Sequence, residues 1–161
     1  MSYATSDLCD EYGEHARILE PILHSHGGKT SFSGIISTLK AFEDYMLVRQ
    51  QLEQPGNGRV LVVDGGASIR CALLGDQTGS LALKNGWAGV VINGAVRDVE
   101  ALGHLEIGIV ALGISPRRSP TGAVGQSDIP VMFGGITFQP GEWLVADADG
   151  IVVLDSSLAA K

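Results

Sequence analysis

Three short, continuously apolar runs in the middle of the chain constrain its fold most strongly. They occupy residues 59–63 (RVLVV), 87–92 (WAGVVI) and 107–114 (IGIVALGI). Runs of this kind are typical of strands that are buried on both faces of a parallel sheet. Turn signals and helical patterns separate them, so strand and helix alternate. We therefore predict an α/β fold with a parallel sheet and right-handed crossovers.

The segments before these runs follow the same alternation. Residues 32–39 (FSGIISTL) are rich in β-branched side chains and predict a strand. Residues 7–11 form an acidic turn that predicts a short capped helix ending near Gly13, and residues 14–30 are interpreted as a loop. Residues 40–53 change to helical spacing, with four apolar side chains on one face: Phe42, Met46, Leu47 and Leu52.

The second half of the chain adds two helices and a set of short strands. A helix is predicted over residues 76–85, despite Gly79 inside it, and a shorter one over residues 97–105. Residues 115–127 are expected to form a loop. Four short apolar runs follow, separated by glycine-containing turns, and predict a C-terminal β-meander that forms a second layer: residues 131–133, 136–138, 143–145 and 151–154.

The composition indicates a globular protein and argues against a nucleic-acid partner. A length of 161 residues with 45% hydrophobic and 18% charged residues fits a single domain spanning residues 1–161. A net charge of −7 disfavours direct binding to a phosphate backbone, because such binding depends on clustered lysine and arginine. The longest basic run, Arg117-Arg118, lies between prolines and is interpreted as a solvated turn.

Neither a disulfide framework nor a membrane segment is indicated. Cys9 and Cys71 lie far apart without metal-ligand spacing, so free thiols are expected. His24 and His26 could share a face only on a strand, and a solvated loop is the preferred interpretation over a metal site. No apolar run reaches membrane-spanning length and no signal-peptide pattern is present, so we expect a cytoplasmic protein with no membrane partner.

Residues 73–100 contain the polar residues with the clearest chemical potential. Twenty residues separate Asp76 from Arg97, about the length of one helix plus one strand, which would return the chain to its starting point. The backbone N–H groups of Gly75-Asp76-Gln77-Thr78 at a helix start would form an anion pocket. Arg97 offers a planar fork of donors, and Asp98 suits a hard divalent cation.

An ordinary structural explanation exists for each of these elements. Gly75-Asp76 and Arg97-Asp98 could simply be the caps of two helices, with a surface charge beside the second. Residue types and spacing alone leave both interpretations open.

Several segments carry a resemblance to a known family: VLVVDGGASIRCALLGD, NGWAGVVINGAVRDV, IGIVALG, FGGITFQPGEWLVADADGI and GGKTSFSGIISTLKAFED. The chain resembles the regulator of ribonuclease E activity A (RraA) family over residues 5–154. That family is related to the metal-dependent aldolases that act on 4-hydroxy-4-methyl-2-oxoglutarate and 4-carboxy-4-hydroxy-2-oxoadipate. Some members were once misnamed as menaquinone methyltransferases, but VVDGGAS resembles a cofactor-binding loop only superficially.

The resemblance implies a swivelling β/β/α domain assembled as a ring-shaped homotrimer, with a hexamer as the alternative. Its aldolase branch is marked by an aspartate, twenty residues and then Arg-Asp, present here as Asp76, Arg97 and Asp98. By this likeness, the main chain of residues 75–78 (Gly75, Asp76, Gln77 and Thr78) holds a pyruvyl carboxylate and Arg97 contacts substrate oxygens. Asp98 holds Mg²⁺ or Mn²⁺, and Asp76 manages a water that exchanges protons with the substrate.

Two functions follow from the resemblance. The first is a divalent-metal-dependent lyase that cleaves 4-hydroxy-4-methyl-2-oxoglutarate-type 2-oxo acids to pyruvate through a metal-stabilised enolate, with oxaloacetate decarboxylase activity. The second is a non-catalytic inhibitor of a ribonuclease E-type endonuclease that acts by protein binding, and the charge of −7 would suit a basic partner surface. The retained acidic residues favour the enzyme, whereas the chain as a whole lies closer to the regulator branch.

Overall fold

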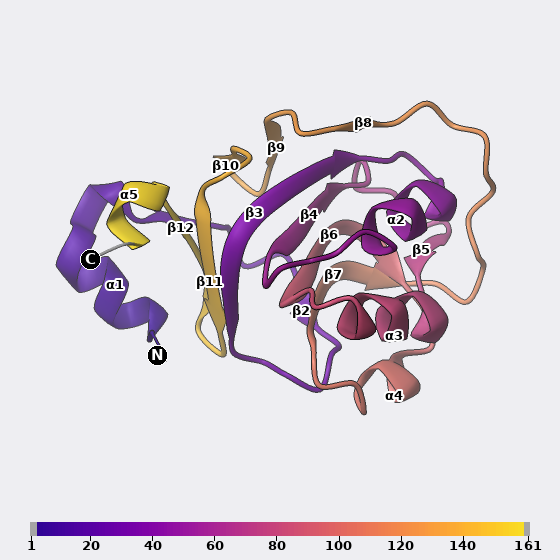
Figure 1. Ribbon diagram of the computed structural model, residues 1–161, viewed down its shortest axis with the longest axis horizontal. Coiled ribbons are helices and arrows are strands. Elements are labelled where there is room, and N and C mark those ends of the chain that lie inside the picture. The colour runs from indigo at the N-terminus through magenta and orange to yellow at the C-terminus, as the bar shows by residue number, and fades with distance from the viewer. Residues whose placement is uncertain (1–2, 160–161) are drawn as a thin grey trace.

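The chain forms one curled ten-stranded sheet covered by helices in the computed structural model, which describes residues 3–159 (Figure 1). The helices are α1 (Thr5–Tyr12), the 3₁₀ helix η1 (Gly13–His15), α2 (Tyr45–Leu52), α3 (Asp76–Lys84), α4 (Val99–Leu102) and α5 (Ser156–Ala159). The strands are β1 (Arg17–Ile18), β2 (His24–Ser25), β3 (Phe32–Lys40), β4 (Val60–Asp64), β5 (Ala72–Leu74), β6 (Gly89–Val96), β7 (Gly108–Ile114), β8 (Gln126–Ser127), β9 (Val131–Phe133), β10 (Ile136–Phe138), β11 (Trp143–Asp147) and β12 (Gly150–Leu154).

The strand order of the large sheet is β1-β12-β11-β3-β4-β6-β7-β2, with β5 paired to β6 and β8 to β3. The pairs β3–β4, β4–β6 and β6–β7 are parallel. These strands contain the apolar runs from which a parallel sheet was predicted, and their central residues are almost fully buried. The predicted α/β class is confirmed.

Strand β3 joins the parallel part of the sheet to the C-terminal strands. Its first half pairs antiparallel with β11, where Ile35 lies opposite Trp143, and its second half pairs parallel with β4, where Ile36 lies opposite Val60. The predicted C-terminal strands are present, but the prediction that they form one meander is wrong: β11 and β12 continue the large sheet through β3, and among the described strands β10 does not pair with β11. Strands β9 and β10 form a separate hairpin around two glycines with positive φ.

Two apolar cores fill the two faces of the parallel strands. Helices α2, α3 and α4 cover one face, burying residues such as Leu52 and Leu102 against β4, β6 and β7. On the other face, Val62 and Val91 contact a core that includes Phe138 and Leu144 from the C-terminal strands. The C-terminal strands therefore supply the second β layer that the sequence predicts, because the sheet curls over itself.

The helix predicted over residues 40–53 is shorter at its start than expected. It begins at Tyr45, because the buried Asp44 side chain accepts hydrogen bonds from the N–H groups of Met46 and Leu47 and caps it there. Glu43 has φ of +50°, which no helix can include. Phe42 therefore lies outside the helix and is 47% exposed, so the prediction that it belongs to the apolar face of the helix is wrong.

Strand β6 is longer than predicted, and several very short strands were not anticipated. The strand predicted over residues 87–92 was expected to end before Asn93-Gly94, a dipeptide typical of turns, but these residues continue it to Val96 with a register shift between Ile92 and Ala95. Strands β1, β2, β5 and β8 contain two or three residues each, too few to show a sequence period. Two of them lie in residues 14–30, which were expected to be a loop.

Among the described residues, none of the helices combines the length and apolar character needed to cross a bilayer.

Candidate active site

A cavity of about 490 Å³ opens where β5 and β6 end at the helical side of the sheet. All six residues singled out in the sequence line it: Gly75, Asp76, Gln77, Thr78, Arg97 and Asp98. Its volume lies within the range of about 300–1,000 Å³ that is usual for small-molecule sites. The structure thus brings both predicted segments to one place.

Parallel pairing explains why these segments meet. Leu74 at the end of β5 lies opposite Val96 at the end of β6, and the Arg97 N–H donates to the Leu74 carbonyl at 3.0 Å. The next residues, Gly75 and Arg97, therefore leave the sheet side by side. Helix α3 and strand β6 account for most of the twenty residues between Asp76 and Arg97.

The start of α3 is an anion-binding position that lacks a capping side chain of its own. Gly75 occupies the N-cap and has no side chain to satisfy the first N–H groups of the helix. The N–H of Asp76 instead donates to Asp98 Oδ2 at 3.1 Å, and the N–H of Gln77 donates to Asp76 Oδ1 at 2.9 Å. A carboxylate from another segment thus lies at the positive end of the helix dipole. Asp76 is the first helical residue, so it is not a simple N-cap.

Asp98 reaches this position through an unusual backbone conformation. Its φ of 58° and ψ of 41° are left-handed, which aspartate tolerates better than most residues. A Cβ atom added to Gly75 would lie 2.5 Å from Asp98 Oδ2. Glycine is therefore needed at residue 75 for the carboxylate to approach. Arg97 Nε lies 3.9 Å from the same oxygen, and both side chains are about one-third to two-fifths exposed, at 34% and 40%.

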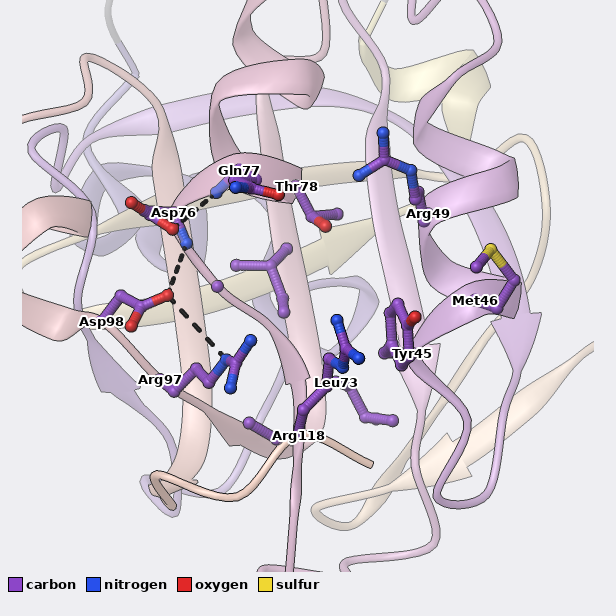
Figure 2. Close-up of a pocket in the computed structure, with 13 residues that line it drawn as sticks. Tyr45, Met46, Arg49, Leu73, Asp76, Gln77, Thr78, Arg97, Asp98 and Arg118 are labelled. Carbon is purple, nitrogen blue, oxygen red and sulfur yellow. Dashed lines mark hydrogen bonds and ion pairs between the residues drawn. The ribbon is translucent and has the colours of Figure 1, made fainter. Parts of the chain in front are cut away.

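The polar side chains divide between two sides of the cavity. Figure 2 shows Asp76, Arg97 and Asp98 grouped on one side. Gln77 is exposed, whereas Thr78 is 7% exposed and forms part of the wall. The opposite side carries residues that sequence reasoning missed, namely Tyr45, Met46, Arg49 and Arg118.

Arg118 was interpreted as part of a solvated turn, and both Arg117 and Arg118 are indeed exposed. Only Arg118 lines the cavity, with its guanidinium 4.6 Å from the centre of the Tyr45 ring. The spacing of Tyr45 and Arg49, four residues apart in a helix, was a signal for a shared face. No comparable periodic signal exists for Arg118, because a loop positions it.

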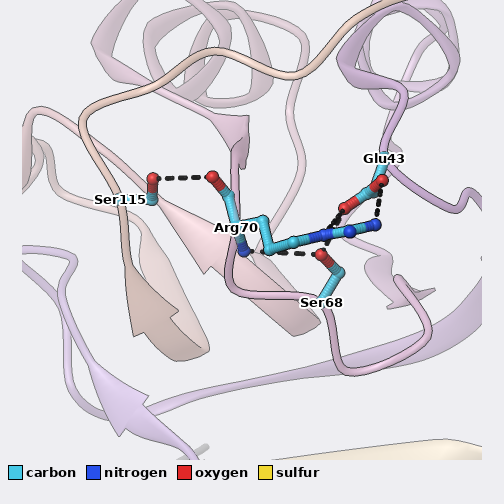
Figure 3. A network of polar contacts seen from close by, with 4 residues as sticks. All are labelled: Glu43, Ser68, Arg70 and Ser115. Carbon is cyan, nitrogen blue, oxygen red and sulfur yellow. Dashed lines mark hydrogen bonds and ion pairs between the residues drawn. The ribbon is translucent and has the colours of Figure 1, made fainter.

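A polar network holds the loops behind the cavity (Figure 3). The Glu43 carboxylate accepts hydrogen bonds from Arg70 Nε at 2.9 Å, Arg70 Nη2 at 2.8 Å and Ser68 Oγ at 2.6 Å. Bonding to Arg70, and then to Ser68, lowers the pKa of Glu43 from its ordinary value. Ser115 Oγ donates to the Arg70 carbonyl at 3.3 Å. Three separate loops are thereby connected next to the site.

The donor set at α3 suits a hard divalent cation. Asp76 and Asp98 offer carboxylate oxygens, and Mg²⁺ commonly uses one or two protein carboxylates together with waters. Within residues 3–159, no group of three or more His, Cys, Asp or Glu side chains is arranged to hold a metal ion. A cation here would therefore need water or substrate oxygens to complete its coordination. The prediction of Asp98 as the single protein ligand has the same requirement.

The glycine-containing loop after β4 is closed by its own hydrogen bonds. The N–H of Gly66 donates to Asp64 Oδ1 at 2.9 Å, and the N–H groups of Gly65 and Ala67 both donate to the Asn93 carbonyl at 3.1 Å. The first N–H groups of this turn are thus used internally. This loop does not offer the free backbone donors that a cofactor-binding loop needs.

Comparisons with known proteins agree on one family. A family model described as RraA-like, Aldolase/RraA, matches residues 5–153. A protein of Pseudomonas syringae pv. tomato named "Putative 4-hydroxy-4-methyl-2-oxoglutarate aldolase" is 53% identical over 158 residues, which is 98% of each chain. A protein of Aromatoleum aromaticum with the same name is 52% identical over 98% of this chain and 99% of its own.

Solved structures give the same result for the fold. The crystal structure of S-adenosylmethionine: 2-dimethylmenaquinone methyltransferase from Geobacillus kaustophilus matches with a TM-score of 0.95, 44% identity and 99% coverage of both chains. The RNA-processing inhibitor RraA from Thermus thermophilis matches with a TM-score of 0.92 and 44% identity, over 96% of this chain and 94% of its own.

Proposed function

Because the chain belongs to the RraA-like (Aldolase/RraA) family, we propose that it is a lyase that cleaves 4-hydroxy-4-methyl-2-oxoglutarate-type 2-oxo acids to pyruvate. The observation that carries the proposal is the Asp98 carboxylate held at the start of α3, with Arg97 beside it. Oxaloacetate decarboxylation is the expected side activity, because loss of CO₂ from oxaloacetate leaves the same pyruvate enolate.

Substrate binding uses the start of α3. The N–H groups at residues 75–78 and the helix dipole attract the carboxylate of the pyruvyl half of the substrate. Arg97 then faces the oxygen on which negative charge develops during cleavage, where a charged donor stabilises the transition state more than the ground state.

Asp98 is the proposed ligand of Mg²⁺ or Mn²⁺. When bound, such a cation supplies positive charge beside the 2-oxo oxygen and favours the enolate form of pyruvate. The first-turn N–H of Asp76 holds the Asp98 carboxylate in place, and the absence of a side chain at Gly75 leaves room for it.

Asp76 is the proposed proton carrier. Cleavage of the C3–C4 bond removes the proton of the C4 hydroxyl, leaves the electron pair in the pyruvate enolate, and ends when C3 takes up a proton. The exposed Asp76 carboxylate lines the cavity and can move these protons through a water molecule.

Release of pyruvate tests this function. The wild type is expected to form pyruvate from 4-hydroxy-4-methyl-2-oxoglutarate and from oxaloacetate with Mg²⁺ or Mn²⁺, and to lose activity in a chelator. Arg97→Ala and Asp98→Ala should each reduce kcat by about 100-fold or more. Glu100→Ala, an exposed acid two residues beyond Asp98, serves as the matched control and should retain activity. A wild type without activity, or an Asp98→Ala variant equal to it, would contradict the proposal.

The similarity to the Thermus inhibitor favours a second candidate function, regulation of a ribonuclease E-type endonuclease by direct binding. The net charge of −7 would suit a basic segment of such a partner. A pull-down with the purified endonuclease should then succeed equally with wild type and Asp76→Ala, and binding should weaken as salt concentration rises. Failure of the wild type to bind at low salt would remove this candidate.

We also propose assembly as a homotrimer, on the basis of the family resemblance. Exposed apolar side chains at or after the carboxyl ends of β3, β4 and β7, namely Phe42, Ile69 and Ile114, support an interface at this edge of the sheet. Light scattering after size-exclusion chromatography distinguishes a trimer from a hexamer or a monomer.

A further inference from the structure

We infer that Arg118, with Arg49 on the same side of the cavity, forms a second anion subsite, which binds the distal carboxylate of a dicarboxylic 2-oxo acid. The subsite would select such acids over 2-oxo acids with an uncharged tail. The choice of substrate rests on the proposed function, whereas the subsite itself rests on residues that the proposed chemistry does not use.

The charges that line the cavity are unbalanced in favour of an anion. Arg49, Arg97 and Arg118 oppose only Asp76 and Asp98. Arg97 lies beside Asp98, so it belongs to the α3 side of the cavity. In the part of the chain that the structure describes, no carboxylate lies within ion-pairing distance of Arg118. The side of the cavity away from α3 therefore carries uncompensated positive charge.

Arg118 has donors available for a bidentate contact. Its Cζ atom lies 4.6 Å from the centre of the Tyr45 ring, and among the described residues no hydrogen bond or ion pair uses its guanidinium N–H groups. A carboxylate accepts two parallel hydrogen bonds from such an edge. Figure 2 shows Arg118 beside Tyr45, with Arg49 further along α2.

Arg49 supplies a second, weaker donor. Its Nε donates to Glu53 Oε1 at 3.2 Å, one helical turn away, and this exposed pair partly offsets its charge. No other described residue hydrogen-bonds with its side chain. The larger share of the subsite is therefore assigned to Arg118.

The backbone fixes the position of Arg118. Ala72 N–H donates to the Arg117 carbonyl at 2.6 Å, and Ser119 N–H donates back to the Ala72 carbonyl at 3.1 Å. Ser119 Oγ also accepts the N–H of Tyr45 at 2.6 Å. Both neighbours of Arg118 are thus attached to β5, and the loop is attached to the start of α2. A site held in this way loses little conformational entropy when a ligand binds.

Two anion sites in one cavity match a substrate with two carboxylates. If the pyruvyl carboxylate lies at the start of α3, the far end of the substrate points towards Arg118. The distal carboxylate keeps its charge throughout C3–C4 cleavage, so its ion pair stabilises ground state and transition state alike. Loss of Arg118 should therefore raise KM and leave kcat nearly unchanged.

Binding of two non-reactive acids tests the subsite without turnover. 2-Oxoglutarate and 2-oxopentanoate have the same chain and differ in the distal carboxylate, and neither has the 4-hydroxyl group that cleavage requires. Titration calorimetry with Mg²⁺ should give the wild type about a tenfold preference for 2-oxoglutarate, as expected for one charge-assisted contact. Arg118→Ala should abolish most of this preference and leave the Kd for 2-oxopentanoate nearly unchanged. Arg118→Lys should be intermediate, because it keeps the charge but loses the fork.

Arg117→Ala is the matched control, since Arg117 lies in the same loop, is exposed and does not line the cavity. It should keep the wild-type preference. The proposed subsite would be wrong if the wild type showed no preference for 2-oxoglutarate. It would also be wrong if Arg118→Ala raised the Kd of both acids by the same factor. If the preference depends on Arg118 but no pyruvate is ever released, the subsite stands and the proposed lyase fails. If pyruvate is released but the preference for 2-oxoglutarate does not depend on Arg118, the proposed lyase stands and only the subsite fails.

Discussion

Helices α2 and α3 both begin at the cavity, but their first turns are completed in opposite ways. At α2 the N-cap residue Asp44 is 2% exposed, and its carboxylate accepts the N–H groups of Met46 and Leu47 at 2.9 and 3.3 Å. At α3 the N-cap is Gly75, and the only carboxylate on its first N–H comes from Asp98, in another segment. The first helix start is closed by its own N-cap residue, whereas the second is occupied by a carboxylate from another segment.

The two helix starts are therefore expected to have different roles: the cap of α2 stabilises the fold, whereas the start of α3 serves the activity proposed for the cavity. The buried cap on α2 also holds the loop between β7 and β8, since Asp44 Oδ2 accepts the Ala123 N–H at 2.8 Å. The start of α3 instead positions the carboxylate of Asp98, which lines the cavity. Changes at the two helix starts should therefore affect different measurements.

The largest effect is expected for Gly75→Ala. The added Cβ would lie 2.5 Å from Asp98 Oδ2 and force the carboxylate away from α3. Pyruvate release should fall by about 100-fold, the usual loss when a preorganised charged group is displaced. Stability should change by less than about 1 kcal/mol, because φ of −130° is allowed for alanine and the Asp98 side chain can move into solvent.

Gly103→Ala provides the comparison for that variant. Gly103 also flanks a short helix near the site, with φ of −63°, and its new Cβ would meet only atoms at 3.4 Å and beyond. It should keep both activity and stability. Equal losses in the two variants would mean that Gly75 is needed for folding rather than for the position of Asp98.

Asp44→Ala should have the opposite signature. It removes the α2 cap and leaves the Ala123 N–H without its acceptor, so the free energy of unfolding should fall by about 2 kcal/mol. Urea denaturation measures this loss. The activity of the remaining folded molecules should decrease far less than in Gly75→Ala, because Asp44 does not line the cavity. A stable but inactive Asp44→Ala protein would remove the distinction between the two helix starts.

The smallest effect is expected for Glu43→Gln, next to the α2 cap. Hydrogen bonds from Arg70, and then Ser68, lower the folded-state pKa of Glu43 below the unfolded value of 4.5. The stabilisation is therefore complete above pH 4.5 and disappears as the pH falls through the folded-state pKa. The wild type should resist urea slightly better than the variant at pH 7, and the two should converge in acid.

Arg70→Ala should show the same pH dependence, and the double variant should lose no more than the larger single loss. A difference between wild type and Glu43→Gln that persists unchanged below the folded-state pKa would show that packing, and not the ion pair, stabilises this loop.

The parallel half of the fold was predictable because its strands are long enough to display a pattern. Continuous burial gives β4, β6 and β7 a signature in the sequence, and parallel pairing then brings Gly75 and Arg97 together without further assumptions. The start of α2 was also encoded, since an aspartate before an apolar periodic segment is a cap signal, but the helical period continued through it.

The far side of the cavity was not predictable from such patterns. Arg118 is positioned by backbone hydrogen bonds between its two neighbours and Ala72. The sequence of a loop without periodicity gives no signal for that pairing. Asn93-Gly94 also misled the prediction, because a dipeptide typical of turns lies inside β6 at a register shift between two neighbouring strands.

The divided pairing of β3 has a consequence for how the chain folds during synthesis. Residues 32–35 find their partner only in residues 143–146, after nearly the whole sequence has been made. Until then, an apolar strand edge with free N–H and C=O groups remains exposed, which invites pairing with other chains. Contacts between such distant residues also form slowly. We therefore expect pairing of β3 with β11, which completes the curled sheet, to be the late step of folding, after the strands that hold the cavity have assembled.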